Sequence, residues 1–326
     1  MVSNFVNLLH HLQAQPLWIL LLSALGFLSL LTHFFFLINW LYITLLRPPK
    51  NLRNYGSWAL ITGATDGIGK AFAFQLAQQG LNLVLVSRSY HKLRYVAAEI
   101  QARYPDTKIK EVALDLSSGG AAVEGAVEGL DVGVLVNNVG VTYPAARFFH
   151  EVEEEVWMKV VRVNLEATTR VTRAVLPGMV KRRRGAIVNI GSGAAVVVPS
   201  HPLFAIYAAT KAYVDQLSRS LYVEYKDMGV DVQCQVPLYV STKMASEVAS
   251  IHRSSLFAPS PEKYAEAAVA RIGFEARCSP YWAHSLQWFF ASMLPERILD
   301  SWRLAIGIRR RQSSLIGPSA GRDKAP

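Results

Sequence analysis

Cysteine is scarce in this 326-residue sequence, which contains only Cys234 and Cys278. Two cysteines cannot build the disulfide framework that stabilises many small secreted domains. The composition therefore favours a reducing compartment for the folded part of the chain. The sequence also lacks zinc-finger spacing, and we predict no metal site.

Acidic residues are fewer than basic ones. The chain has 34 lysines and arginines against 24 acidic residues, which gives a formal net charge of +10. Such a balance suits anionic substrates, a membrane surface or nucleic acid. There is no RNP-like motif and no basic array with interleaved aromatic residues, so nucleic acid is the least favoured partner. We predict that the chain does not bind it.

Charge is missing altogether between Leu17 and Leu46. About 20 apolar residues span a bilayer as a helix, so we predict an N-terminal segment over 1–16 and a transmembrane anchor over 17–46. A signal peptide would have a shorter apolar core and a basic start, and a buried core helix would be shorter and carry charge. Arg47, Lys50 and Arg53 follow at once and, by the positive-inside tendency, keep the folded domain in the cytosol. An anchor that bends back is the alternative topology.

A strand, a glycine-rich turn and a helix follow the anchor. Trp58–Gly63 is a short apolar run, and the segment from Lys70 to Gln79 has a helical pattern. Between them, Gly63 permits the sharp turn, Gly67 lets the backbone approach a pyrophosphate, and Gly69 lets the helix pack closely. The amides and dipole of the helix N-terminus favour a phosphate there. The predicted cofactor-binding residues of this turn are Gly63, Thr65, Asp66, Gly67, Ile68 and Gly69.

The second apolar strand ends at Arg88, where many dinucleotide folds have an acid that binds the ribose hydroxyl. An arginine there favours a 2′-phosphate, because its planar donors match phosphate oxygens. We therefore predict NADPH as the cofactor, with a solvated surface arginine as the alternative. Lys92 is a second candidate, although a solvated helix face explains it equally well.

Further strands are predicted at 109–114, 132–136 and 230–236, separated by helical segments. This alternation predicts an α/β fold of the Rossmann type, with a doubly wound parallel sheet covered by helices on both faces. Asp115 follows the first of these strands and either meets the adenine end of the nucleotide or caps the helix before Ser117. Asn137 follows the second, where asparagines bond neighbouring backbone and shape the floor of the cofactor site.

Three groups suited to proton transfer come together in the middle of the chain. A buried strand ends at Ser192, and Tyr207 and Lys211 lie one turn apart on the same helical face. Asn164 lies within a long helix predicted over 152–181, where an asparagine is unfavourable and indicates a specific polar role. Each residue alone has an ordinary structural explanation, but the set together points to an active site.

These motifs resemble the short-chain dehydrogenase/reductase family. The resemblance runs from Trp58 to Thr242 and includes Asn164, Ser192 and the Tyr207-x-x-x-Lys211 pair. Val139, where the family usually has alanine, and the segment from Gln235 to Met244 are similar to the very-long-chain 3-oxoacyl-CoA reductase branch, including plant members. That branch is related to membrane-bound 17-beta-hydroxysteroid dehydrogenases.

The resemblance implies a role for each of these residues. Tyr207 would protonate the substrate oxygen, Lys211 would stabilise the phenolate and hold the nicotinamide ribose, and Ser192 would bond the developing oxyanion. Asn164 would position a water in the proton relay, and Thr242 would join the cofactor-binding residues. The implied activity is NADPH-dependent reduction of very-long-chain 3-oxoacyl-CoA on the cytosolic face of the endoplasmic reticulum membrane, beside other elongase subunits. A hydroxysteroid dehydrogenase and a catalytically silent elongase scaffold are the alternatives.

The resemblance also sets the predicted domain limits. An NADP-binding domain is expected over 52–280, followed by an apolar segment and a basic, polar tail over 281–326. Residues 245–259 are expected to cover the substrate, and 261–272 to form a helix. The aromatic segment 281–294 would be interfacial, line the acyl chain or pack as a helix. Arg309-Arg310-Arg311 and the end from Ser313 are expected to be solvated or disordered.

Overall fold

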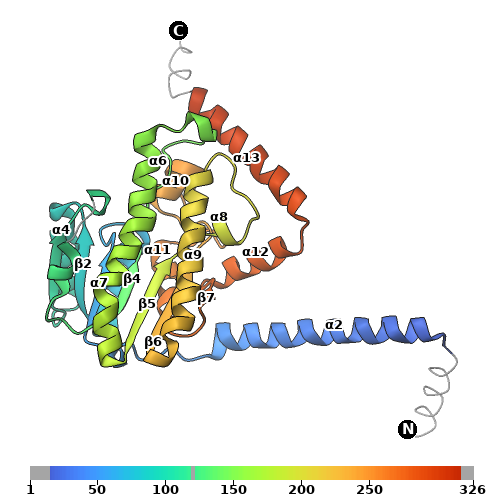
Figure 1. Ribbon diagram of the computed structural model, residues 1–326, viewed down its shortest axis with the longest axis horizontal. Helices are drawn as coiled ribbons and strands as arrows, with labels where there is room; N and C mark the ends of the chain where they lie inside the picture. The colour runs from blue at the N-terminus through green and yellow to red at the C-terminus, as the bar shows by residue number, and fades with distance from the viewer. Residues whose placement is uncertain (1–14, 119–121, 317–326) are drawn as a thin grey trace, which may run out of the picture. The chain divides into compact units, whose positions relative to one another are not determined.

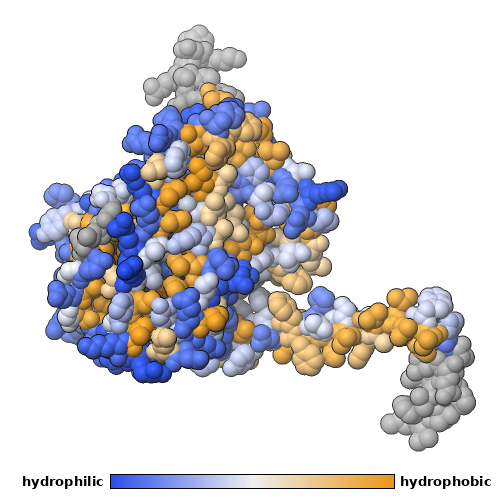
Figure 2. Space-filling view, viewed as in Figure 1, coloured by the Kyte–Doolittle hydropathy of each residue, from blue (hydrophilic) through white to orange (hydrophobic). Residues whose placement is uncertain are grey.

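The computed structural model describes residues 15–118 and 122–316, and its contacts divide the chain between Pro48 and Pro49. In the first unit, helix α2 (Leu17–Leu41) continues into a π-helical turn at Tyr42–Leu46. No residue of α2 is buried, and its surface is mostly apolar (Figures 1 and 2). Leu17–Leu46 is the one helix in the described part that is long and apolar enough to cross a membrane. The predicted apolar helix is therefore confirmed.

The second unit contains a seven-stranded sheet in the order β3-β2-β1-β4-β5-β6-β7, and every pair of neighbours is parallel. The strands are β1 (Trp58–Thr62), β2 (Asn82–Ser87), β3 (Ile109–Ala113), β4 (Val132–Asn137), β5 (Gly185–Ile190), β6 (Val230–Gln235) and β7 (Arg277–Cys278). The order reverses after β3, where the chain crosses to the far side of β1. This is the predicted doubly wound arrangement, which places a ligand crevice at the carboxyl ends of the central strands.

Helices cover both faces of the sheet (Figure 1). Three of them, α3 (Gly67–Gln78), α4 (Tyr90–Arg103) and α11 (Pro261–Val269), share one apolar core with the sheet. On the other face lie α5 (Ala122–Val127), α7 (Ala167–Arg182) and α9 (Ala205–Tyr225). Strand residues such as Leu60 and Ile61 alternate between the two cores and are fully buried. Burial on both faces explains why the strands read as continuous apolar runs.

The long helix predicted over 152–181 is interrupted. It consists of α6 (Glu154–Val161), a π-helical turn at Arg162–Glu166 and then α7. Asn164 lies inside the π turn and is buried. Such single π turns occur frequently at functional sites. The asparagine that is unfavourable in a regular helix thus marks the point where the helix departs from regularity.

Four more helices complete the carboxyl-terminal part: α8 (Gly193–Val196), α10 (Lys243–Ala249), α12 (Trp282–Ser292) and α13 (Glu296–Ile316). The sequence predicts that the segment from Arg309 is solvated or disordered. It is helical as far as Ile316, where α13 ends, and Arg309 and residues 312–315 are exposed to solvent, whereas Arg310 and Arg311 are half-buried. The remainder of the expected tail lies outside the described residues. Polar contacts hold α13 in place: Ser200 Oγ donates to Asp300, and Arg311 pairs with Glu151. Hydrophobic periodicity does not reveal a helix held in this way.

Candidate active site

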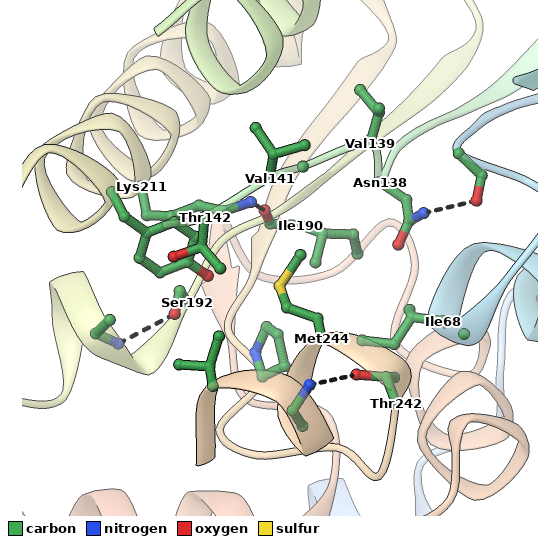
Figure 3. Close-up of a pocket in the computed structure, with 18 of the residues that line it drawn as sticks. Ile68, Asn138, Val139, Val141, Thr142, Ile190, Ser192, Lys211, Thr242 and Met244 are labelled. Atoms are coloured by element: carbon green, nitrogen blue, oxygen red, sulfur yellow. Dashed lines mark hydrogen bonds between the residues drawn. The ribbon is translucent and has the colours of Figure 1, made fainter. Parts of the chain in front are cut away.

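A cavity of about 980 Å³ opens at the carboxyl ends of the central strands. Its lining includes Gly63 after β1, Arg88 after β2, Ser192 after β5, and Tyr207 and Lys211 on α9. Figure 3 shows Lys211 and Ser192 on one side of the cavity, and Ile68 and Asn138 on the other. The fold therefore brings the predicted nucleotide turn and the predicted proton-transfer groups into one cavity.

The glycine turn has the geometry that the sequence predicts. Gly63 and Gly67 have φ values of +66° and +51°, which favour glycine. A Cβ on Gly69 would lie 2.3 Å from the carbonyl oxygen of Gly63, so only glycine allows α3 to begin so close to β1. Asp66 is the N-cap of α3 and accepts a hydrogen bond from the Gly67 amide at 2.7 Å. Thr65 Oγ1 lies 2.9 Å from Ser87 Oγ, which fixes the turn against β2.

Two exposed basic side chains, Arg88 and Lys92, line the cavity beside this turn. Neither makes an ion pair with a described residue. Asp115 also lines the cavity, and its Oδ1 accepts hydrogen bonds from the amide and hydroxyl of Ser117 at 2.9 and 2.7 Å. These bonds, assisted by Arg88 and outweighing burial, lower the pKa of Asp115. The capping role of Asp115 is therefore present, and its position also permits contact with a nucleotide.

The two asparagines after β4 point in different directions. Asn137 is not among the cavity-lining residues, because its side chain is buried and donates to Thr172 Oγ1 and Asn189 Oδ1 at 2.9 and 2.8 Å. Asn138 lines the cavity and donates to the carbonyl oxygen of Thr62 at 3.0 Å. The sequence singled out Asn137 for cofactor binding, but Asn138 is the residue that ties β4 to the glycine turn. A role for Asn137 at the cofactor stays a prediction.

Ser192 is the N-cap of α8, and its Oγ accepts a hydrogen bond from the Ala194 amide at 3.1 Å (Figure 3). Its own O–H remains available as a donor toward the cavity. Burial raises the pKa of Tyr207, whereas a hydrogen bond with Ser192 acts in the opposite direction. The phenol is thus protonated at neutral pH and lies in hydrogen-bonding contact with a second hydroxyl. This is the pair that a carbonyl oxygen requires for protonation.

Lys211 is 6% exposed, and its Nζ donates to the carbonyl oxygen of Ile190 at 2.8 Å. Burial lowers its pKa to about 8, so the amine carries its charge at neutral pH. Burial of the phenol is the largest influence on the pKa of Tyr207, which it raises, and stabilisation of the phenolate by Lys211 stays a prediction. The ammonium instead bonds the end of β5, close to Gly140, where a Cβ would lie 3.4 Å from Nζ.

Asn164 does not line the cavity but supports it from behind. Its Oδ1 accepts from the Val141 amide at 2.8 Å, and its Nδ2 donates to the Val141 carbonyl at 2.9 Å and to Thr210 Oγ1 at 3.1 Å. The side chain therefore holds the segment after β4 against α9, near the Tyr207–Lys211 face. Its predicted role at a water in the proton relay stays a prediction.

The remaining predicted residue, Thr242, lines the cavity and caps α10, with Oγ1 accepting from the Ala245 amide at 3.3 Å (Figure 3). Its methyl group would lie 3.1 Å from a Cβ placed on Gly67, so the α10 segment reaches across to the glycine turn. Sequence reasoning missed the neighbouring wall. His284 on α12 is fully buried and bonds Leu238 N and Tyr239 O at 3.3 and 3.1 Å.

The residues of α12 and of the segment after β6 that form this side of the site belong to no recognisable sequence motif. Burial lowers the pKa of His284 to about 4, so the ring is neutral, with Nδ1 accepting from Leu238 and Nε2 donating to Tyr239. His284 itself does not line the cavity but bonds the backbone of Leu238 and Tyr239, which do. Cavity-lining residues from outside the predicted set are Tyr143, His201, Tyr239, Gln287, Trp302 and Arg303. Their only signal in the sequence is their residue type, and only the folded chain brings them to the site.

Comparison with known proteins agrees with this geometry. Residues 57–252 match the family model for short chain dehydrogenase. The chain belongs to the short-chain dehydrogenase family. A solved structure of a short-chain dehydrogenase from Sphingobium yanoikuyae in complex with NADPH matches with a TM-score of 0.61 and 30% identity, covering 82% of this chain and 99% of that one. Seven parallel strands with a crevice at their carboxyl ends are thus the fold of this family.

Two relatives show the range of functions near this chain. A very-long-chain 3-oxoacyl-CoA reductase-like protein from Arabidopsis thaliana is 60% identical over 93% of this chain and 98% of that protein. A human protein named inactive hydroxysteroid dehydrogenase-like protein 1 is 41% identical over 82% of each chain. The family assignment is therefore firm, whereas the substrate depends on the site itself.

Proposed function

We propose that this chain reduces very-long-chain 3-oxoacyl-CoA to 3-hydroxyacyl-CoA with NADPH, in microsomal fatty-acid elongation. The observation that carries the proposal is the shared cavity: Tyr207, Ser192 and Lys211 face the same space as the glycine turn and Arg88. The similarity to a 3-oxoacyl-CoA reductase-like protein supports the substrate class. Members of the family are oxidoreductases, and every proton-transfer group predicted from the sequence is present.

The residues around the glycine turn fit NADPH. Gly63 and Gly67 have positive φ, and a side chain at Gly69 would collide with backbone, so the turn leaves backbone free to approach a pyrophosphate. Arg88 lines the cavity and forms no ion pair with a described carboxylate, so its donors are free to bind a 2′-phosphate. The residues that would hold the cofactor are the glycine turn, Arg88, Asn138, Lys211 and Thr242. When bound, NADPH supplies a hydride to the substrate carbon.

The chain itself supplies the proton and the orientation. The Tyr207 phenol donates its proton to the substrate oxygen as negative charge develops there. Although burial raises the pKa of this phenol, an alkoxide is the stronger base, so the transfer is favourable. Ser192 donates a hydrogen bond to the same oxygen, in the manner of an oxyanion hole. The balanced reaction consumes one ketone, one NADPH and one proton and gives one alcohol and one NADP⁺.

The apolar part of the cavity suits an acyl chain. Its lining includes Val197, Val198, Leu238, Met244 and Val248. Turnover of the purified full-length protein with 3-oxoacyl-CoAs of increasing chain length tests the proposal directly. We expect NADPH consumption to increase with chain length up to the capacity of the cavity. Faster reduction of ketosteroids than of every acyl-CoA would contradict the substrate assignment.

The second candidate substrate is a ketosteroid, because a large apolar cavity beside a proton-transfer pair also accepts a rigid polycyclic ketone. A third possibility is a silent scaffold of an elongase complex, since a relative at 41% identity is named inactive. The presence of Tyr207, Ser192 and Lys211 in one cavity argues against a scaffold, which has no need of them together. If Tyr207→Phe complements a reductase-deficient cell as well as the unmutated chain, the scaffold is the correct description.

We further propose that Leu17–Leu46 spans the endoplasmic reticulum membrane and that the catalytic unit faces the cytosol. The apolar, unburied α2 and the basic residues Arg47, Lys50 and Arg53 support this orientation. Protease added to sealed microsomes should digest the catalytic unit and spare a tag at the N-terminus. Protection of the catalytic unit would contradict the orientation, and digestion of both would favour an anchor that bends back. Association with other elongase subunits follows from the same proposal.

A further inference from the structure

Arg303, on the side of the cavity formed by α13, is a buried cation without a counter-charge. The residue is 8% exposed and lines the cavity. It makes no ion pair within the described residues, and its buried Nε has no hydrogen-bond partner. A buried charge that lacks a compensating charge is strongly destabilising. A protein keeps such a group where a ligand supplies the missing charge.

The groups that do contact Arg303 are neutral. Its Nη2 donates to His201 Nδ1 at 2.6 Å, and its guanidinium lies 5.7 Å from the ring centroid of Trp302. Burial, with Arg303 and Arg310 nearby, lowers the pKa of His201 to about 3. The imidazole therefore accepts a hydrogen bond without adding charge of either sign. These contacts orient the guanidinium and leave its positive charge intact.

Arg310, two turns further along α13, adds a second positive charge. Its Nη2 donates to the phenol oxygen of Tyr239 at 3.0 Å, and its guanidinium carbon lies 5.6 Å from the centroid of that ring. Burial alone would raise the pKa of Tyr239, but Arg310 and Arg303 outweigh it and lower that pKa. Both arginines thus act on one phenol, and that phenol in turn influences the pKa of Tyr207. Tyr239, with which both arginines interact, lines the cavity.

Within the described residues, Asp300 and Glu151 form no ion pair with Arg303 or Arg310, although Asp300 keeps its negative charge one turn before Arg303 on α13. Asp300 accepts a hydrogen bond from Ser200 Oγ, and Glu151 pairs with Arg311. Arg311 is therefore neutralised, whereas its neighbour Arg310 is not. Two guanidinium groups that interact with one cavity-lining phenol, neither of them in an ion pair with a described carboxylate, match a doubly charged oxyanion better than a singly charged one. Arginine is the side chain that best fits the planar faces of such groups.

We propose that Arg303 and Arg310, which both interact with Tyr239, form an anion subsite that binds a phosphate of the coenzyme A arm of the substrate. The proposal rests on the proposed function and adds to it the part of the cavity that receives the carrier. A fatty-acid carboxylate shares the chemistry of the subsite but carries a single charge. The subsite would make the enzyme select its substrate by the carrier as well as by the acyl chain.

The test compares one acyl group on two carriers in the full-length protein. Arg303→Met should lower kcat/KM for a 3-oxoacyl-CoA by roughly tenfold to a hundredfold, mainly through KM, because it removes a charged hydrogen bond. The same acyl group on N-acetylcysteamine, which has no phosphate, should change by less than about twofold. Arg309→Met is the matched control, since Arg309 is an exposed arginine on the same helix outside the cavity lining. An equal loss on both carriers would mean that Arg303 only holds α13 in place, and no loss on either would also overturn the subsite.

Equilibrium binding separates this proposal from the proposed reaction. Coenzyme A, pantetheine and a long-chain free fatty acid are each titrated into the NADP⁺-saturated protein. Coenzyme A should bind more weakly to Arg303→Met, and pantetheine should bind equally to both proteins. If only the fatty acid depends on Arg303, the phosphate assignment is wrong. If the unmutated protein reduces no 3-oxoacyl-CoA, the proposed function fails, while the binding of coenzyme A still decides the subsite.

Discussion

The two sides of the cavity are built by different means. On the cofactor side, residues at the ends of adjacent strands are brought together by the sheet itself, as when Asn138 bonds the carbonyl of Thr62. On the substrate side, α12 and α13 contribute side chains that contact residues far away in the sequence, as when Arg303 bonds His201. The first side is fixed by backbone geometry and the second by individual side-chain contacts. Substitutions should therefore act differently on the two sides.

Tyr207→Phe should have the largest effect, because it removes the proton donor shared by both sides. We expect reduction to slow by about a thousandfold, within the range for loss of a general acid. NADPH affinity should change little, since the glycine turn is untouched. Steady-state reduction and fluorescence titration of NADPH measure the two quantities.

Tyr213→Phe provides the control for that experiment. Tyr213 lies on the same helix, but its phenol contacts Thr169 Oγ1 at 2.8 Å and does not line the cavity. Activity should stay within about twofold of the unmutated protein. A comparable loss in both variants would show that the phenols stabilise α9 and that Tyr207 is not the donor.

Arg88→Asp should weaken the use of NADPH while leaving the residues that contact the substrate unchanged. Replacing a phosphate partner with a like charge should lower kcat/KM with NADPH by roughly a hundredfold, with a much smaller effect on NADH. Lys92→Ala, a second exposed cation on the same wall, should shift the preference less. Equal losses of kcat/KM with NADPH and with NADH would contradict the proposal that Arg88 makes the enzyme prefer NADPH.

Sequence reasoning anticipated the geometry of the glycine turn because that turn depends on residue types with restricted backbone geometry. Gly63, Gly67 and Gly69 are needed for backbone reasons that are visible as spacing. Tyr207 and Lys211 share a helical face by their separation alone. The parallel sheet followed from the alternation of apolar runs with helical segments, and the observed strand order agrees with it.

The substrate side lacked such signals. Among its described large side chains α13 buries only Leu299 and Arg303, and Ile308 packs half-buried against the cluster that contains Leu203 and Phe204. Several of its other contacts with the rest of the chain are polar. A helix with so little apolar burial resembles a solvated tail in sequence. The roles of His284 and Tyr239 depend on contacts between α12 and the segment after β6, which no local pattern encodes. For the same reason, sequence analysis selected Asn137 as the cofactor-binding asparagine, although Asn138 is the one that lines the cavity.

The pH dependence should report on Lys211, which lies where the two sides meet. Its pKa is lowered from 10.5 to about 8 by burial. The ammonium bonds the end of β5 and is predicted to hold the cofactor ribose, so reduction should slow as pH rises through about 8. We expect up to about a tenfold loss per pH unit above that value. A rate that is constant through this range would contradict a role for the ammonium.

Stability should respond to the same group with the opposite sign. Above about 8 the folded state has released the Lys211 proton while the unfolded state retains it up to 10.5, so the unfolded state binds more protons. The free energy of unfolding therefore gains a contribution that rises with pH in that window, by up to about 1.4 kcal/mol per unit. Lys211→Met should remove this contribution, and Lys243→Met, at an exposed lysine, should retain it. Cys234 interacts electrostatically with Lys211, and burial raises its pKa from 9.0 to about 12, so above pH 9 it contributes with the opposite sign. The variants are therefore compared between about pH 8 and 9.

The smallest effects should come from alanine substitution of two helical glycines, Gly69 on the cofactor side of the cavity and Gly307 on the substrate side. The measured quantity is the free energy of unfolding. Alanine is intrinsically favoured over glycine in a helix by about 1 kcal/mol. At Gly69 the new Cβ would lie 2.3 Å from the Gly63 carbonyl oxygen, and rigid backbone cannot move away, so Gly69→Ala should lower the free energy of unfolding by about 1–3 kcal/mol.

At Gly307 on α13 the nearest atom would be the Leu203 side chain, at 3.0 Å. That side chain can shift by a few tenths of an ångström, so the clash and the gain in helix propensity should nearly cancel. We expect Gly307→Ala to change the free energy of unfolding by less than about 1 kcal/mol. Chemical denaturation of both variants measures the difference. A Gly307→Ala penalty as large as that of Gly69→Ala would show that α13 is held as rigidly as the glycine turn, and the contrast between a backbone-built and a side-chain-built wall would then be lost.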